Sequence, residues 1–228
     1  MTGSSESALL PPSLRVRLGL TAILAALVVV VIGVLYAGHT EPGRVDRWFV
    51  EPTADSVRPP WRYVALSLDF MGEPVGAVML IAAVVAGCLL LRCPRAAVLA
   101  VVGAGMSVVT ATLLKHLVGR TIHGDGNLSY PSGHTAFLTA LALVLALLAT
   151  GRLGLGRTAG TTLVLIAALL AGAAMGWAEV ALGAHYPTDA LGGWCTALAV
   201  IPATAWLVDR AADRRPAPIA DADQHEPR

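Results

Sequence analysis

The sequence predicts an all-α fold: a polytopic membrane protein organised as a six-transmembrane-helix bundle. The chain of 228 residues is 56% hydrophobic and only 14% charged, whereas soluble domains carry about 25% charged residues. Six uncharged runs each approach the roughly 20 residues that a helix needs to cross a bilayer. They cover residues 18–37, 74–91, 96–114, 135–151, 158–178 and 190–208.

The first run is interpreted as a retained helix. It is longer than the about 7–15 apolar residues of a signal-peptide core, and the sequence YAGHT that follows it is a poor cleavage site. Segments 1–14 and 212–228 are polar or rich in serine and proline, so we expect both to be disordered tails. Residues 15–211 then form one membrane domain.

The connections between the runs alternate in length. Long loops cover 38–73, 115–134 and 179–189, whereas 92–95 and 152–157 are short and fall on the same side as both termini. That side also carries more arginines, so the positive-inside rule predicts cytoplasmic termini and outward-facing long loops in the cell membrane. In the first long loop, residues 59–72 suit either a short interfacial helix or an aromatic anchor.

The composition argues against a nucleic-acid-binding protein and against a metal site built from cysteines. The net charge of +1 offers no basic field for nucleic acid. Cys88, Cys93 and Cys195 show no metal-binding spacing, and packing is the simplest role for them.

The three long loops hold the unusual polar residues, and the first cluster lies around Lys115. This is the single lysine of the chain, at the outer end of the third run, and Arg120 and His123 follow it. Lys115 suits either a snorkelling anchor or a ligand for an anion.

The second cluster lies in the stretch NLSYPSGHTAFL, where Ser132, Gly133 and His134 precede an apolar run. Free N–H groups at a helix N-terminus bind anions, and a glycine lets an anion approach the backbone closely. Ser132 also suits a simple helix cap, but a cap does not explain a histidine at a membrane boundary.

The third cluster contains Glu179, His185 and Asp189. A carboxylate four residues after a histidine can fix the imidazole tautomer and leave the other nitrogen free to attack. The alternative is a structural histidine followed by a capping aspartate.

Together the clusters favour phosphoryl transfer through a phosphohistidine. His185 is the expected nucleophile, oriented by Asp189, and His134 is the expected proton donor to the leaving oxygen. Lys115 and the N–H groups near Ser132 and Gly133 would hold the phosphoryl oxygens. This chemistry requires no metal and no cofactor.

These residues resemble the type 2 phosphatidic acid phosphatase superfamily, which includes the vanadium haloperoxidases. Its motifs are Lys-x6-Arg-Pro, Pro-Ser-Gly-His and Ser-Arg-x5-His-x3-Asp. The second is intact at 131–134, and His185 and Asp189 match the catalytic half of the third. The resemblance covers roughly residues 60–208 and implies a helical membrane phosphatase with the roles given above.

The chain departs from the family at both motif arginines, which bind phosphate in this family. Ile122 and His123 stand where Arg-Pro is expected, and Ala178 and Glu179 stand where Ser-Arg is expected. Arg120 and His123 are candidates to replace the lost cations, and Glu179 is expected to modulate the site.

The leading hypothesis is a metal-independent phosphatase that acts on a lipid phosphate, such as phosphatidic acid or a polyprenyl diphosphate. The alternatives are a weak or inactive relative that binds lipid phosphate as a scaffold, and a lipid phosphotransferase. A haloperoxidase is the least expected, because vanadate needs a strong cationic clamp. The sequence leaves the lipid and the oligomeric state open.

Overall fold

The computed structural model describes residues 8–53, 57–124 and 126–214. These residues form eight helices, joined by loops that include one isolated bridge between Thr121 and Leu128. The helices are α1 (Pro12–Leu35), α2 (Arg44–Thr53), α3 (Trp61–Gly72), α4 (Pro74–Leu90), α5 (Pro94–Val118), α6 (Gly133–Arg152), α7 (Arg157–Ala181) and α8 (Pro187–Asp213).

Five of the helices are long and apolar enough to cross a membrane, namely α1, α5, α6, α7 and α8. The 17 residues of α4 meet the same criteria only together with α3, and the two helices meet at a bend of 72°. Counting this bent pair as one span gives the expected six. The prediction of an all-α, six-helix membrane bundle is therefore confirmed.

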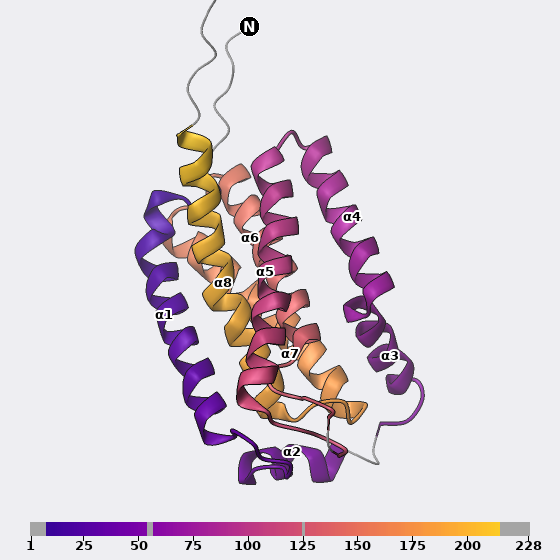
Figure 1. The fold of residues 1–228 in the computed structure, drawn as a ribbon. Helices are drawn as coiled ribbons and strands as arrows, with labels where there is room; N and C mark the ends of the chain where they lie inside the picture. The colour runs from indigo at the N-terminus through magenta and orange to yellow at the C-terminus, as the bar shows by residue number, and fades with distance from the viewer. Residues whose placement is uncertain (1–7, 54–56, 125, 215–228) are drawn as a thin grey trace, which may run out of the picture.

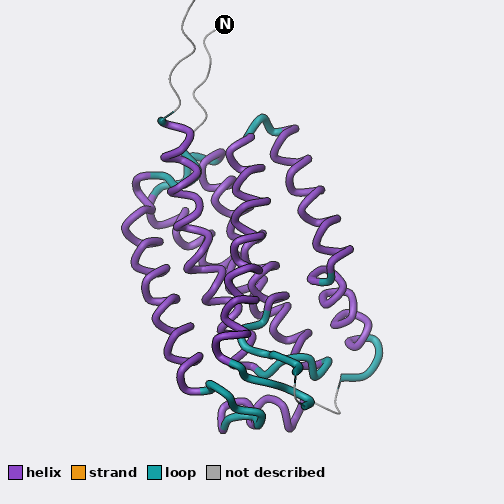
Figure 2. Tube along the Cα trace, viewed as in Figure 1, coloured by secondary structure: helices purple, strands orange, loops and turns teal. Residues whose placement is uncertain are grey.

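The two described chain ends lie at the same end of the bundle (Figure 1). The α4–α5 connection lies at this end too, whereas the α1–α2, α5–α6 and α7–α8 connections gather at the opposite end, which we call the site end (Figure 2). The long loops therefore lie together at the site end, as their alternation with short loops predicts, and this brings the three polar clusters to the same end of the bundle.

Helix α6 lies in the middle of the bundle and is the most deeply buried of the candidate spans. Its side chains, including Phe137, Leu143 and Val144, join one apolar core with residues of α1, α5, α7 and α8. Many of the core residues are alanines, and such small residues let helix backbones approach closely in a membrane. Large aliphatic side chains of α1, α4 and α5 remain exposed on the outside, where lipid would cover them.

The described part of the N-terminal segment is ordered, which shortens the expected 1–14 tail. Leu9 and Leu10 are buried, and their N–H groups each donate to the Asp209 carboxylate at 2.9 Å. Helix α1 then begins at Pro12, a residue suited to the first turn. At the other terminus α8 continues to Asp213. Residues 1–7 and 215–228 lie outside the described residues.

Helix α2 was not expected, because its residues lie in the first long loop. It crosses beneath the site end of the bundle (Figure 1). Its acidic first-turn residue Asp46 has no exposed surface. A buried carboxylate needs strong partners, and these lie in the site described next.

Candidate active site

The tight connection between α7 and α8 brings Glu179 and His185 together. The N–H of Ala184 donates to the Glu179 carbonyl at 2.9 Å, and the turn passes through Gly183 at a φ of 75°. Glycine adopts this conformation without a steric penalty. The turn folds the chain back, so that the His185 Nε2 atom lies 3.4 Å from the Glu179 Oε2 atom.

Asp189 lies in the first turn of α8 and faces the other nitrogen of His185. Its Oδ2 atom is 3.7 Å from His185 Nδ1 and accepts a hydrogen bond from the Tyr186 N–H at 3.0 Å. Asp189 is fully buried and His185 is 7% exposed. Asp189 and His185 are therefore neighbours, but His185 Nδ1 has no hydrogen-bond partner among the described residues, and the orienting role of Asp189 stays a prediction.

Arg120 forms a buried ion pair with Asp189. Its guanidinium donates to Asp189 Oδ1 at 2.7 Å, to Asp46 Oδ2 at 2.7 Å and to Thr188 Oγ1 at 2.6 Å. Asp46 Oδ1 accepts hydrogen bonds from the N–H and hydroxyl of Thr188. Four residues from three distant parts of the sequence are therefore fixed around the start of α8.

Two aromatic rings complete the enclosure of Arg120. The guanidinium carbon lies 4.1 Å from the Tyr36 ring centroid and 4.6 Å from that of Tyr186, within the range of cation–π attraction. Burial raises the pKa of Tyr186, so its ring stays a neutral phenol. Arg120 has no exposed surface and two carboxylate partners. In this arrangement its charge is already compensated, and it is not presented to a phosphate as the sequence suggested.

The Pro-Ser-Gly-His stretch forms the N-terminus of α6. Ser132 is the N-cap, and its hydroxyl accepts a hydrogen bond from the Thr135 N–H at 3.2 Å. The Ala136 N–H donates to the Ser132 carbonyl. This leaves the N–H groups of Gly133 and His134 without a hydrogen-bond partner among the described residues. Ser132 is thus a helix cap, and the two N–H groups that follow it are of the kind that bind anions at helix N-termini.

His134 lies where the bend between α3 and α4 meets α6. Its Nε2 atom is 4.0 Å from Asp69 Oδ1 and 3.8 Å from Glu73 Oε1, and its Nδ1 atom is 3.9 Å from Glu179 Oε1. Gly72 makes this approach possible, because a Cβ atom there would lie 1.9 Å from His134 Cδ2. The two acidic residues escaped the sequence interpretation, although Asp69 is a lone carboxylate inside an apolar stretch.

Glu179 lies between the two histidines and is only 1% exposed. Its Oε1 atom has no hydrogen-bond partner among the described residues. The ligating atoms of His134, Glu179 and His185 all lie within 4.8 Å of one another. A carboxylate thus stands at the position where the sequence resemblance implies a phosphate-binding arginine.

The other expected cations are differently placed. Half-buried Lys115 lies in the last turn of α5 and interacts electrostatically with Asp189 and Glu179. His123 is exposed, and its Nε2 atom is hydrogen-bonded to the Gly183 carbonyl at 2.7 Å, which ties two loops together. Ile122 is 4% exposed, so the first missing arginine is replaced by an apolar side chain packed inside the protein.

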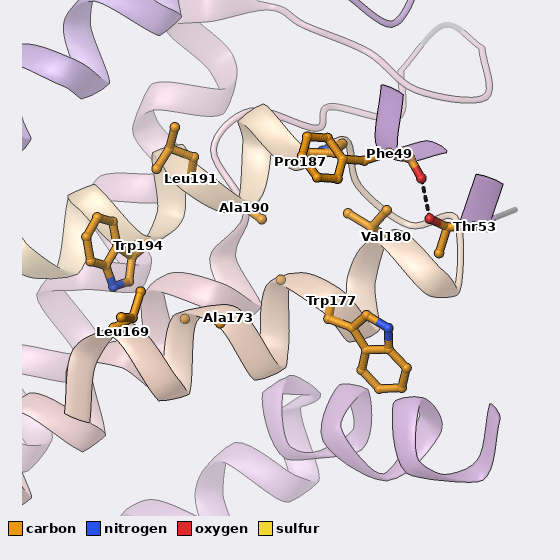
Figure 3. Close-up of a pocket in the computed structure, with 12 residues that line it drawn as sticks. Phe49, Thr53, Leu169, Ala173, Trp177, Val180, Pro187, Ala190, Leu191 and Trp194 are labelled. Atoms are coloured by element: carbon orange, nitrogen blue, oxygen red, sulfur yellow. Dashed lines mark hydrogen bonds between the residues drawn. The ribbon is translucent and has the colours of Figure 1, made fainter. Parts of the chain in front are cut away.

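An apolar groove of about 360 Å³ runs between α7 and α8 beside this site. Figure 3 shows Leu169 of α7 next to Trp194 of α8, with Phe49 of α2 at the other end; Ala173, Trp177 and Leu191 also line the groove. The lining is almost entirely hydrocarbon, and Val180 and Pro187 bring it to the connection that carries His185. An alkyl chain is the kind of ligand that such a lining accepts.

One solved structure shares this architecture. It is the crystal structure of the first transmembrane PAP2-type phosphatidylglycerolphosphate phosphatase from Bacillus subtilis, with a TM-score of 0.66 and 20% sequence identity over 86% of this chain and 98% of that chain. At this identity the likeness shows a common fold. No curated protein matches the sequence. The family model of the PAP2 superfamily matches residues 96–213, which include both histidines and Asp189, and the chain therefore belongs to the PAP2 superfamily.

Proposed function

We propose that this protein is a membrane lipid phosphate phosphatase that hydrolyses a phosphate monoester or diphosphate through a phosphohistidine on His185. The observation that carries the proposal is the convergence of His185 and His134 at the N-termini of α8 and α6, with Asp189 behind His185. The nitrogen that faces Asp189 would keep its proton, which leaves Nε2 with the lone pair that a nucleophile needs.

The reaction has two steps. His185 Nε2 attacks phosphorus, the bond to the lipid oxygen breaks, and protonated His134 gives its proton to that oxygen. A water molecule then attacks the phosphohistidine while His134 accepts its proton, and this releases inorganic phosphate. The N–H groups of Gly133 and His134 and the ammonium of Lys115 are the groups available for the phosphoryl oxygens.

A lipid substrate fits the surroundings of the site. The groove between α7 and α8 offers an apolar surface for an alkyl chain next to the polar end of the bundle (Figure 3). The distribution of arginines supports cytoplasmic termini and an outward-facing site. We therefore propose that the head group is hydrolysed at the outer face of the membrane.

The test is phosphate release by detergent-purified protein from phosphatidic acid and from a polyprenyl diphosphate. His185→Ala should lower kcat/KM by several orders of magnitude, because removal of a covalent nucleophile leaves only binding and electrostatic contributions. The matched control is His116→Ala, which removes an exposed histidine from the last turn of α5 and should retain activity. Equal activity of His185→Ala and wild type would rule out the phosphohistidine.

Glu179 favours a second candidate, a weak or inactive relative that binds lipid phosphate. Its carboxylate lies against the attacking nitrogen and would repel a phosphate more strongly in this buried site than at a surface. If this repulsion limits the site, Glu179→Arg should strengthen phosphate and vanadate binding and raise turnover. Glu179→Gln removes the negative charge without adding a positive one, so comparison with Glu179→Arg shows how much each change contributes. Weaker vanadate binding by both variants would show that Glu179 does not oppose the anion.

A further inference from the structure

We propose that His134, Glu179 and His185 form a binding site for one divalent transition-metal ion of the Zn²⁺ type. This site goes beyond the proposed phosphatase activity, which uses the same histidines without a metal. The observations that carry it are the geometry of the three side chains, their outer carboxylates and the unpartnered oxygen of Glu179.

The spacing of the three side chains suits coordination. Zinc binds imidazole nitrogen and carboxylate oxygen at about 2.0–2.2 Å in tetrahedral sites, which places neighbouring ligand atoms about 3.4 Å apart. The His185 Nε2 and Glu179 Oε2 atoms are 3.4 Å apart, and His134 Nδ1 is 3.9 Å from Glu179 Oε1. One ligand atom of each of the three side chains lies within 4.8 Å of the others, so the ion would draw the three side chains closer than they lie without it.

Each histidine also has a carboxylate near its outer nitrogen, at 3.7–4.0 Å, although neither outer nitrogen has a hydrogen-bond partner among the described residues. His185 directs its other nitrogen, Nδ1, towards Asp189, and His134 directs Nε2 towards Asp69 and Glu73. Such carboxylates fix the ring orientation and make the ligating nitrogen more basic. Both inner nitrogens thus face Glu179 while both outer nitrogens face an acidic residue.

The charge balance around Glu179 favours a cation. A buried polar atom without a partner is destabilising, and Glu179 Oε1 is such an atom. Asp69 lies against the same carboxyl group, and Glu73 adds a third acidic residue. Lys115 interacts with Glu179 electrostatically, yet forms no ion pair within 4.0 Å among the described residues. A divalent ion would neutralise this cluster and give Glu179 a partner.

The ligand set indicates the class of ion. Two imidazoles and one carboxylate suit Zn²⁺ and other first-row transition ions, whereas Mg²⁺ and Ca²⁺ prefer oxygen ligands. Three protein ligands leave a fourth position for water or an oxyanion. With the ion bound, the Nε2 lone pair of His185 is used in coordination, so the phosphohistidine cannot form in that state.

The test uses full-length protein without a histidine tag, purified in detergent and stripped with a chelator. Isothermal titration with Zn²⁺ should show one ion per chain, and X-ray absorption should show two imidazole ligands. Glu179→Gln keeps the side-chain volume and should weaken Zn²⁺ binding by about 100-fold or more, since even outer partners contribute 10–100-fold. His134→Ala should act likewise. The control His116→Ala should bind as wild type does.

Two results would overturn the metal site: no Zn²⁺ binding by wild type, or unchanged affinity in both Glu179→Gln and His134→Ala. Turnover measured in parallel separates this proposal from the phosphatase. Stripped protein that hydrolyses lipid phosphate and is inhibited by Zn²⁺ supports both proposals. Zn²⁺ binding that depends on Glu179, in a protein that is inactive when stripped, supports the metal site and contradicts the phosphohistidine. Stripped protein that is active and binds no Zn²⁺ supports the phosphohistidine and contradicts the metal site.

Discussion

At the residue scale, Asp189 lies between His185 and a buried network of charged residues. One of its oxygens accepts from Arg120 and the other from the Tyr186 N–H, on the side that faces His185. Arg120 in turn bonds Asp46 on α2. The position of Asp189 beside His185 thus depends on Arg120 and Asp46, which are fully buried.

Arg120→Leu should destabilise the whole protein. The change leaves Asp46 and Asp189 buried without their common cation, and breaking a buried pair in this way costs about 3–5 kcal/mol. Thermal unfolding in detergent measures the effect. Arg157→Ala, which removes an exposed arginine, should change the free energy of unfolding by no more than about 0.5 kcal/mol. Equal stability of the two variants would contradict the network described here.

The local part of the site could be predicted from the sequence, and its long-range part could not. His185 and Asp189 are four residues apart, so their spacing alone indicates a pair. Asp46 meets Thr188 across 142 positions, and no local pattern encodes such a contact. For the same reason Arg120 looked available to phosphate until its two carboxylate partners were seen.

At the scale of elements, the bend between α3 and α4 places acidic residues against the site. The two helices meet at 72°, with Asp69 before the bend and Glu73 within it. The length of the uncharged runs predicted the five long spans well, because the thickness of the bilayer sets the length of a membrane-spanning helix. It did not predict the packing of α3 against α7, where Trp61 and Trp177 meet edge to face.

Gly72→Ala tests the contact between this bend and His134. The added methyl group would lie 1.9 Å from the imidazole, so the ring must move. A displacement of about 1 Å at a catalytic group lowers turnover by about 100-fold, and we expect this loss in phosphate release with little change in thermal unfolding. The control is Gly87→Ala in α4, where a methyl group meets open space. Normal turnover of Gly72→Ala would contradict a role for His134 in the reaction.

At the scale of the whole molecule, the bundle is polarised. One end carries both described chain ends, and the other carries the α1–α2, α5–α6 and α7–α8 connections (Figure 1). The arginine pattern predicts which end faces the cytoplasm, since orientation depends on charge in the short loops.

Orientation can be measured with a cysteine at exposed Asn127, next to the start of α6, in a Cys93→Ser background. A membrane-impermeant thiol reagent should label Asn127→Cys in intact cells. Leu153→Cys, at an exposed position in the α6–α7 connection, should react only after lysis. The opposite pattern would place the site on the cytoplasmic side.

The contact of Leu9 and Leu10 with Asp209 has a consequence for biosynthesis. The partners are about 200 positions apart, and at a synthesis rate of about 5–20 residues per second the ribosome needs roughly 10–40 s to travel between them. Helix α1 packs against α8 along the bundle, so α1 is made well before its partner α8. During that interval its inward face must be shielded by lipid or by the insertion machinery. The hydrogen bonds to Asp209 form only after α8 has been synthesised.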